Sequence, residues 1–184
     1  MNLHLNLTFR KERIIPSLLA LGILGTVQAA APRFHLPLDG NTEIIGSADE
    51  TLSTALIHGQ PRYVKGVNGQ ALELRRYAYD QVTALQLTRL PALECREGTV
   101  SFWYKPEQDG SSENTNWLFY GISKKFRCYL IKLPKGKLEL SVCSPNQRQL
   151  IVNQKFKAGT WTHLAFSWNI PAGEVAVYID GRLA

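Results

Sequence analysis

The sequence at residues 159–168 (GTWTHLAFSW), followed after a short break by residues 175–182 (VAVYIDGR), decides the fold class of this chain. Both segments alternate between core-type and other side chains, which is the pattern of a strand with one buried face. The break between them contains a proline and a glycine, which are typical of turns. The pattern therefore predicts a β-hairpin with three apolar cross-strand pairs. These pairs are Trp168 with Val175, Phe166 with Val177, and Leu164 with Ile179.

Short apolar segments separated by turn residues precede this hairpin. They lie at residues 34–38, 55–58, 62–64, 71–74 and 82–87. No segment of the expected domain has a convincing apolar period of 3.6, and no internal repeat is evident. Many short strands with turn residues between them predict an all-β fold, a two-sheet antiparallel jelly-roll sandwich.

Two further segments, residues 98–106 (GTVSFWYKP) and 69–74 (GQALEL), complete a recognisable order of motifs. Together with the terminal hairpin they resemble the laminin-G-like and pentraxin-like jelly rolls of the concanavalin A-like lectin/glucanase superfamily. The resemblance covers roughly residues 33–184. It also implies a loop and a final strand beyond Arg182. We therefore expect a domain that is incomplete at its C-terminus, with an uncovered sheet edge prone to association. The alternative is a shorter variant that covers this edge with its N-terminal strand.

The first 31 residues are expected to be a signal peptide rather than part of the domain. Arg10, Lys11 and Arg13 precede an apolar run at residues 14–27, and small residues allow cleavage after Ala29 or Ala31. This predicted signal helix is shorter than the roughly 20 residues that span a bilayer. The alternative is a short membrane-anchoring helix. The favoured prediction is an exported protein, secreted, periplasmic or at the cell surface, with no stable membrane insertion after cleavage.

The domain at residues 32–184 is then a single unit that keeps a basic character. The whole chain has a net charge of +6, and cleavage after Ala29 removes three cations and one acid, which leaves +4. A chain of this length can bury a core of its own.

A second hairpin is predicted at residues 126–144, with its turn at residues 134–137. A symmetric turn pairs Lys132 with Glu139 and Cys128 with Cys143 on the outer face. The apolar pairs then face the core, and they are Leu133 with Leu138, Ile131 with Leu140, and Tyr129 with Val142. An exported chain allows a disulfide between Cys128 and Cys143, with two reduced cysteines as the alternative. Cys95 is left over.

Catalysis is not expected. Glucanases of this fold need two carboxylates about 5 to 5.5 Å apart, and no strand supplies such a pair. Glu107 and Asp109 have a suitable spacing, but they lie in a turn-rich loop. His163 and Asp180 fall opposite each other without a nucleophile nearby, so a structural hydrogen bond is favoured over a catalytic dyad. We expect a protein that is not an enzyme.

No cofactor is required by the sequence, although calcium is considered. The candidate oxygen ligands in loops are Asp39, Asn41, Asp80 and Asp109. Their spacing is not diagnostic, and Asp-Gly pairs such as the one at Asp39 are also typical of simple turns.

Two groups of residues are candidates for ligand binding. Trp117 and Tyr120 follow a polar loop and are suited to stacking on a sugar, or alternatively to packing at the start of a strand. Cations gather around the second hairpin, where an acidic or sulfated polysaccharide is one partner and simple solvation of an edge is the alternative. These cations are Lys124, Lys125, Arg127, Lys132, Lys135 and Lys137. No nucleic-acid-binding motif is present.

The sequence thus predicts an exported, non-catalytic recognition module for carbohydrate, with a glycan or cell-surface polysaccharide as partner. One alternative is a structural or adhesion domain that binds a surface protein. Another is an accessory domain or fragment of a larger secreted glycoside hydrolase.

Overall fold

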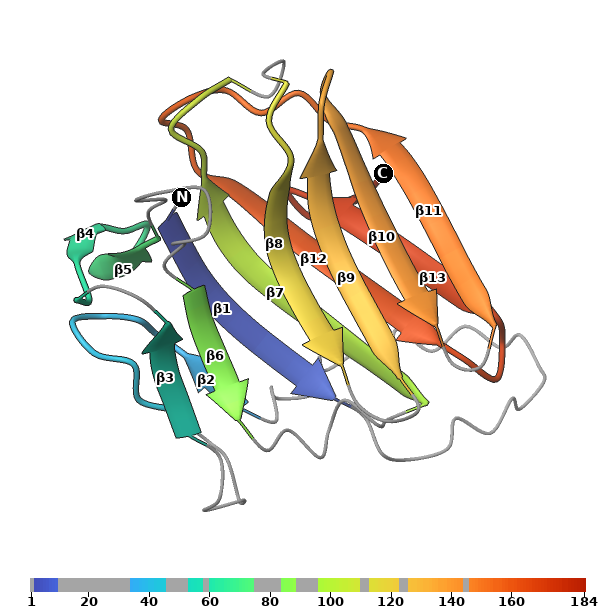
Figure 1. The fold of residues 1–184 in the computed structure, drawn as a ribbon, viewed down its shortest axis with the longest axis horizontal. Coiled ribbons are helices and arrows are strands. Elements are labelled where there is room, and N and C mark those ends of the chain that lie inside the picture. The colour runs from blue at the N-terminus through green and yellow to red at the C-terminus, as the bar shows by residue number, and fades with distance from the viewer. Residues whose placement is uncertain are drawn as a thin grey trace, which may run out of the picture.

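The computed structural model shows an antiparallel sandwich built from strands (Figure 1). It describes residues 2–9, 34–45, 53–57, 60–74, 84–88, 96–109, 113–122, 126–143 and 146–184. Within these ranges there is no helix, and hence none long and apolar enough to cross a membrane. The predicted two-sheet jelly-roll class is confirmed.

The larger sheet has eight strands, and the terminal hairpin lies at one side of it (Figure 1). In spatial order its strands are β14 (Arg182–Leu183), β13 (Glu174–Ile179), β12 (Thr162–Asn169), β7 (Glu97–Lys105), β1 (Asn2–Phe9), β5 (Gln70–Glu73) and β4 (Tyr63–Lys65), with β2 (Phe34–Leu36) paired to β1. The terminal hairpin has the predicted register, with Trp168 opposite Val175 and Phe166 opposite Val177.

A four-stranded sheet lies over this one, and the core is buried between them (Figure 1). Its strands in order are β11 (Gln147–Asn153), β10 (Lys137–Cys143), β9 (Arg127–Leu133) and β8 (Asn116–Ile122), and a separate pair is formed by β3 (Ser53–Ile57) and β6 (Ala84–Thr88). Phe102 and Phe166 of the larger sheet and Leu130 and Leu140 of the smaller one are fully buried. The apolar alternation of each strand therefore faces the opposing sheet.

The predicted register of the β9–β10 hairpin is wrong by one residue. Leu133 pairs with Lys137, so the loop holds three residues, and both Lys135 (φ 60°) and Gly136 (φ 71°) have positive φ. The symmetric turn expected from the sequence would have been one residue longer. Because side chains alternate between faces, this single step turns the β9 side chains to the faces opposite those predicted, whereas Leu138, Leu140 and Val142 of β10 face the core as expected.

The predicted disulfide is wrong for the same reason. Cys128 lies opposite Val142 and is buried in the core, whereas Cys143 lies opposite Arg127 on the outer face. The two thiols lie on opposite faces of the sheet and are not bonded to each other. Burial raises the pKa of the Cys128 thiol far above its usual value. Cys95 lies outside the described residues.

The N-terminal residues take a place that the sequence analysis did not foresee. The expected signal helix at residues 14–27 lies outside the described residues, but Asn2–Phe9 forms β1 and pairs with β7 along its whole length. In this register Leu3 lies opposite Tyr104 and Leu5 opposite Phe102. Signal cleavage remains a prediction, and in this structure the first residues complete the larger sheet.

Candidate functional site

The outer face of the four-stranded sheet carries the two aromatic residues that were predicted to bind a ligand. Trp117 and Tyr120 on β8 are 55% and 52% exposed. They are three residues apart, yet Trp117 pairs with Ile131 and Tyr120 with Tyr129, because a register shift between Trp117 and Phe119 adds a residue to β8. Such a bulge re-aims side chains, and here it turns both rings away from the core.

Tyr129 on β9 joins these two residues into one aromatic surface. The ring centroids of Trp117 and Tyr120 are 5.6 Å apart and nearly perpendicular, at 85°. Those of Trp117 and Tyr129 are 5.4 Å apart, at 67°. Edge-to-face contacts of this kind hold rings in defined positions. The three rings therefore form one continuous surface with a fixed shape.

A carboxylate lies beside this surface. The Tyr129 hydroxyl donates a hydrogen bond to Glu139 Oε1 at 2.9 Å, and the Glu139 side chain is largely buried. On the same strand, Ser141 Oγ accepts a hydrogen bond from Gln147 Nε2 at 3.1 Å. We call Trp117, Tyr120, Tyr129 and Glu139 the aromatic face. It combines apolar ring surface with fixed hydrogen-bonding groups, which is the composition of sites that grip a polyol.

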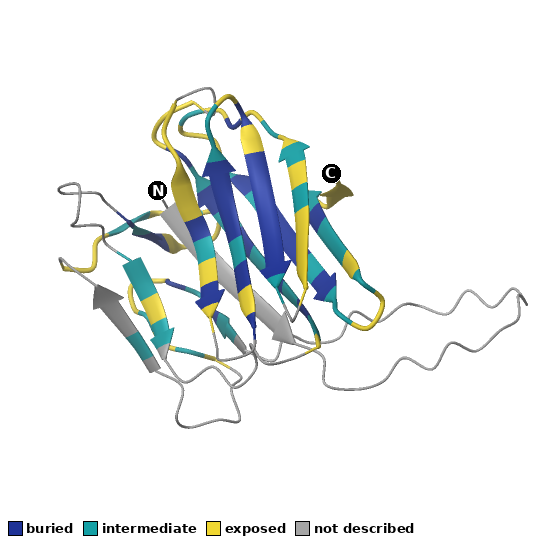
Figure 2. Cartoon of the chain, turned by 45° about the vertical axis from the view of Figure 1, so that its right-hand side comes forward, coloured by how far each residue is buried: buried dark blue, intermediate teal, exposed yellow. Residues whose placement is uncertain are grey.

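Exposure across the sheet follows the same arrangement. Figure 2 shows β9 and β10 largely buried, with exposed residues along the flanking strands β8 and β11.

Sequence analysis found Trp117 and Tyr120 but missed Tyr129 and Glu139. The register expected from the sequence places Tyr129 in the core and Glu139 beside Lys132.

The prediction that Lys132 faces outward is wrong. Its side chain points into the sandwich and is 1% exposed, and Nζ donates a hydrogen bond to the Asn114 carbonyl at 2.9 Å. Burial lowers the pKa of Lys132, while the nearby charge of Glu113 acts in the opposite direction. Lys132 therefore binds the loop before β8 through this hydrogen bond, and it is not part of an exposed ligand-binding surface.

The remaining cations do not form one patch. Lys135 and Lys137 lie at the hairpin tip, where the Lys155 side chain lies against Gly136. Arg127 lies at the opposite end of β9, roughly 20 Å away at about 3.3 Å per residue. Lys124 and Lys125 lie outside the described residues. The described part of the predicted basic site thus reduces to a cluster at the tip, Lys135, Lys137 and Lys155, which we call the tip lysines.

The described calcium candidates accept hydrogen bonds from main-chain amides in loops, and they do not gather around one point. Asp39 Oδ1 accepts a hydrogen bond from the Gln70 amide at 2.8 Å, and Asp109 Oδ1 accepts one from the Ala158 amide at 2.8 Å. Asn41 Oδ1 accepts one from the Glu43 amide at 3.0 Å. Asp80 lies outside the described residues. The part of the chain that the structure describes contains no cluster of three or more His, Cys, Asp or Glu residues that could hold a metal ion.

His163 and Asp180 make structural hydrogen bonds at the end of the terminal hairpin. The His163 amide donates to Asp180 Oδ1 at 2.9 Å, and the Asp180 amide donates to the His163 carbonyl at 2.9 Å. The imidazole packs on Trp103 with centroids 5.2 Å apart. Burial lowers the pKa of His163, and Asp180 opposes this shift. The Asp180 carboxylate therefore holds the main chain at this end of the hairpin.

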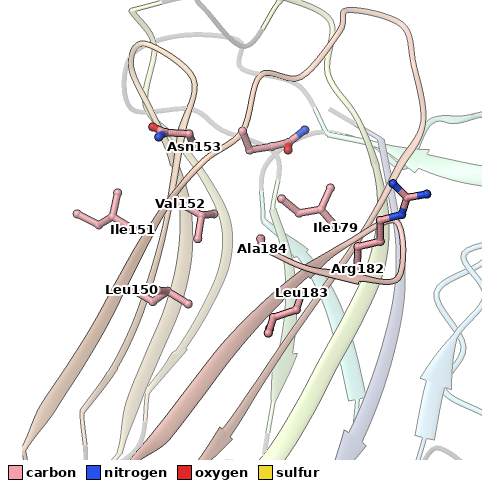
Figure 3. A pocket seen from close by; sticks show the side chains of 9 residues that line it. Leu150, Ile151, Val152, Asn153, Ile179, Arg182, Leu183 and Ala184 are labelled. Carbon is pink, nitrogen blue, oxygen red and sulfur yellow. The ribbon is translucent and has the colours of Figure 1, made fainter.

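An open groove runs between the two sheets at the β11 side of the sandwich (Figure 3). Its volume is about 530 Å³, and its apolar lining includes Leu150 and Val152 of β11 together with Ile179 and Leu183. Arg182 is the charged residue of its lining. The groove lies between β11 and β14, which are edge strands of the two sheets.

The two-sheet fold, with the aromatic face on its smaller sheet, is that of a class of protein, the lectin-like jelly rolls. Residues 79–184, more than half of the chain, match the family model of the concanavalin A-like lectin/glucanases superfamily. The chain belongs to this superfamily, and the resemblance expected from its sequence motifs is confirmed. Comparison with curated proteins and with solved structures finds no match.

Proposed function

We propose that this chain is an exported, non-catalytic recognition module that binds a neutral glycan on its aromatic face. The observation that carries the proposal is the exposure of Trp117 and Tyr120 in a fixed aromatic surface next to Glu139. The apolar face of a sugar ring stacks on such side chains, while its hydroxyls donate to carboxylate oxygens. Membership in a superfamily of lectin-like domains supports this function.

The proposed function is non-catalytic because the aromatic face contains one carboxylate, not the pair that glycoside hydrolysis needs. Glycoside hydrolysis needs two carboxyl groups on either side of the scissile bond, about 5 to 9.5 Å apart depending on mechanism. Glu139 is the one carboxylate of the aromatic face, and it already accepts a hydrogen bond from Tyr129. A release of reducing sugar from any polysaccharide by the purified chain would overturn this part of the proposal.

A glycan microarray probed with the full chain tests the binding function. We expect signals for neutral glycans that disappear in Trp117→Ala and Tyr120→Ala. The matched control is Trp161→Ala, since this half-buried tryptophan lies elsewhere, with Lys105 Nζ 5.0 Å from its ring centroid. Equal signals from all three variants would contradict the aromatic face. Binding to a surface protein in the absence of any glycan signal would favour the adhesion domain instead.

Export is part of the proposal and is supported by the basic residues and the apolar run before Ala29. A chain cleaved after Ala29 or Ala31 would lack β1. The intact mass of the protein recovered outside the cytoplasm tells which form is exported. A retained N-terminus would replace the cleaved-signal prediction with an uncleaved chain in which β1 completes the sheet.

The tip lysines favour a second candidate, binding of an acidic polysaccharide. Lys137 is exposed beside Lys135, and Lys155 lies against the same turn. Retention on a heparin column should then fall strongly toward about 0.5 M salt, where screening is much stronger than at physiological ionic strength. Replacing all three lysines with glutamine should abolish retention, and Arg127→Gln at the far end of β9 should not. Unchanged retention of the triple variant would exclude this candidate.

A further inference from the structure

Strand β1 holds a central place in the larger sheet. It pairs with β7 along all eight of its residues and, on its other side, with β2 and β5 (Figure 1). The stretch of β7 that it covers includes core residues that are at most 1% exposed, which are Val100, Phe102 and Tyr104. Removal of β1 would therefore leave main-chain groups of β7 without their hydrogen-bond partners in the middle of a sheet.

The same residues also lead the segment that is expected to direct export. Arg10, the first cation of the expected signal peptide, follows Phe9 directly, and the apolar run begins at residue 14. A cut after Ala29 or Ala31 would separate β1 from the rest of the chain. A segment held between neighbouring strands cannot at the same time lead the chain to a membrane. The two uses of residues 2–9 therefore exclude each other.

We propose that folding and export compete for residues 2–9. In the unfolded chain these residues lead the signal peptide, and in the folded chain they complete the larger sheet. A chain that folds first keeps its N-terminal segment and is withdrawn from export. The proposal rests on the export part of the proposed function and is independent of glycan binding. It requires two forms of the protein, an exported form without β1 and a retained form with it.

The separation of β1 and β7 along the chain gives export the first opportunity. Asn2 pairs with Lys105. At a synthesis rate of about 5–20 residues per second, the roughly 100 residues between them take about 5–20 s to emerge. Pairing that closes so long a loop is also intrinsically slow. A chain that reaches the membrane within this interval is exported, and a chain that completes β7 first can fold with β1 in place.

A proline in β1 separates the two uses of the segment. Leu5 lies opposite Phe102 of β7 on one side and Leu36 of β2 on the other. Proline has no N–H and does not fit a strand that is paired on both sides. Leu5→Pro leaves the cations and the apolar run of the expected signal peptide unchanged. Leu5→Ile is the matched control, because isoleucine keeps the N–H and suits a strand.

The first measurement is the stability of the uncut full chain, made by cell-free synthesis without membranes. Leu5→Pro should lower the melting temperature by about 5 °C or more, because it breaks a buried ladder hydrogen bond. Leu5→Ile should melt as the wild type does. An unchanged melting temperature in Leu5→Pro would overturn the proposal.

The second measurement is signal cleavage by membrane vesicles that carry an export channel and a signal peptidase. Vesicles present during synthesis should cut all three chains. Vesicles added after synthesis should cut Leu5→Pro about tenfold faster than the wild type and Leu5→Ile, since breaking a buried hydrogen bond raises the population with β1 detached by that order. Equal rates for the proline and isoleucine variants would overturn the proposal. No cleavage in any reaction would instead refute export itself, which is a failure of the proposed function.

Amide hydrogen exchange of the wild-type full chain covers the case in which Leu5→Pro does not fold. Residues 2–9 should exchange as slowly as β7, because central strands open only when the sheet opens. Exchange of these amides at the rate of an unfolded peptide would overturn the proposal without any variant.

Discussion

The two hairpins of this molecule differ in what determines their register. In the terminal hairpin the inward residues Leu164, Phe166 and Trp168 alternate with residues that suit the outer face, and the observed pairs are the predicted ones. In the β9–β10 hairpin both faces contain apolar residues, such as Leu130 and Ile131. Alternation therefore fixes the register of the first hairpin, whereas the turn fixes that of the second.

The turn of the second hairpin has a conformation that its sequence does not signal clearly. Gly136 is suited to a positive φ, but Lys135 also adopts one, at 60°. A non-glycine residue in this region is uncommon, so a longer symmetric turn is the simpler expectation. The three-residue loop that results decides which side chains form the aromatic face.

The largest expected effect tests which face of β9 is buried. Leu130→Ala should lower the free energy of unfolding by about 2–5 kcal/mol, because it opens a cavity in the core. Tyr129→Ala, one residue away, should cost about 1 kcal/mol through its hydrogen bond to Glu139. Urea unfolding of both variants checks this order. The reverse order would support the register expected from the sequence.

A smaller effect is expected at the turn itself. Gly136→Ala should destabilise the chain by about 1–2 kcal/mol, since its φ of 71° is unfavourable for a side chain. The added Cβ would also lie 2.9 Å from Lys155 Cγ. Gly159→Ala is the matched control, because Gly159 has a φ of 70° and a Cβ added there would meet no neighbouring atom within 4 Å. Urea unfolding of the two variants gives the comparison, and a smaller loss at Gly136 than at Gly159 would argue against a tightly packed turn.

The terminal hairpin should show a modest pH dependence through His163. Burial lowers the pKa of His163 in the folded state, so on acidification the unfolded chain takes up its proton first. The contribution to stability is therefore present above the ordinary value of about 6.5 and is lost as pH falls through the folded pKa. Urea unfolding at about pH 8 and about pH 5 should show this loss in the wild type and a smaller one in His163→Gln. Equal losses would assign the pH dependence to other groups.

The smallest expected effect on stability is that of chemical modification at Cys143. This cysteine is partly exposed on the outer face, whereas Cys128 is buried in the core. Under reducing conditions, a thiol reagent removed after a short exposure should therefore modify Cys143 before Cys128 and leave the melting temperature nearly unchanged. Peptide mass mapping checks the order. Modification of both cysteines at the same rate would support the register that places them side by side on the outer face.

The sequence predicted the fold class, the superfamily and the terminal hairpin because these depend on alternation and on motifs within single segments. It also named Trp117 and Tyr120 as candidates for ligand binding, with packing at the start of a strand as the alternative. It could not predict their neighbours, because Tyr129 and Glu139 join them only through the turn geometry and the bulge in β8. The alternation of leucines at residues 3–7 could have indicated β1, but the basic residues and the apolar run that follow favoured a signal peptide.

The central claim is that the aromatic face binds a glycan, and calorimetric titration tests it most directly. The glycan with the strongest array signal would be titrated into the wild type, Trp117→Ala and Trp161→Ala. Loss of the Trp117 ring should weaken binding at least tenfold, about 1.4 kcal/mol, and Trp161→Ala should bind as the wild type does. An unchanged affinity in Trp117→Ala would contradict the account.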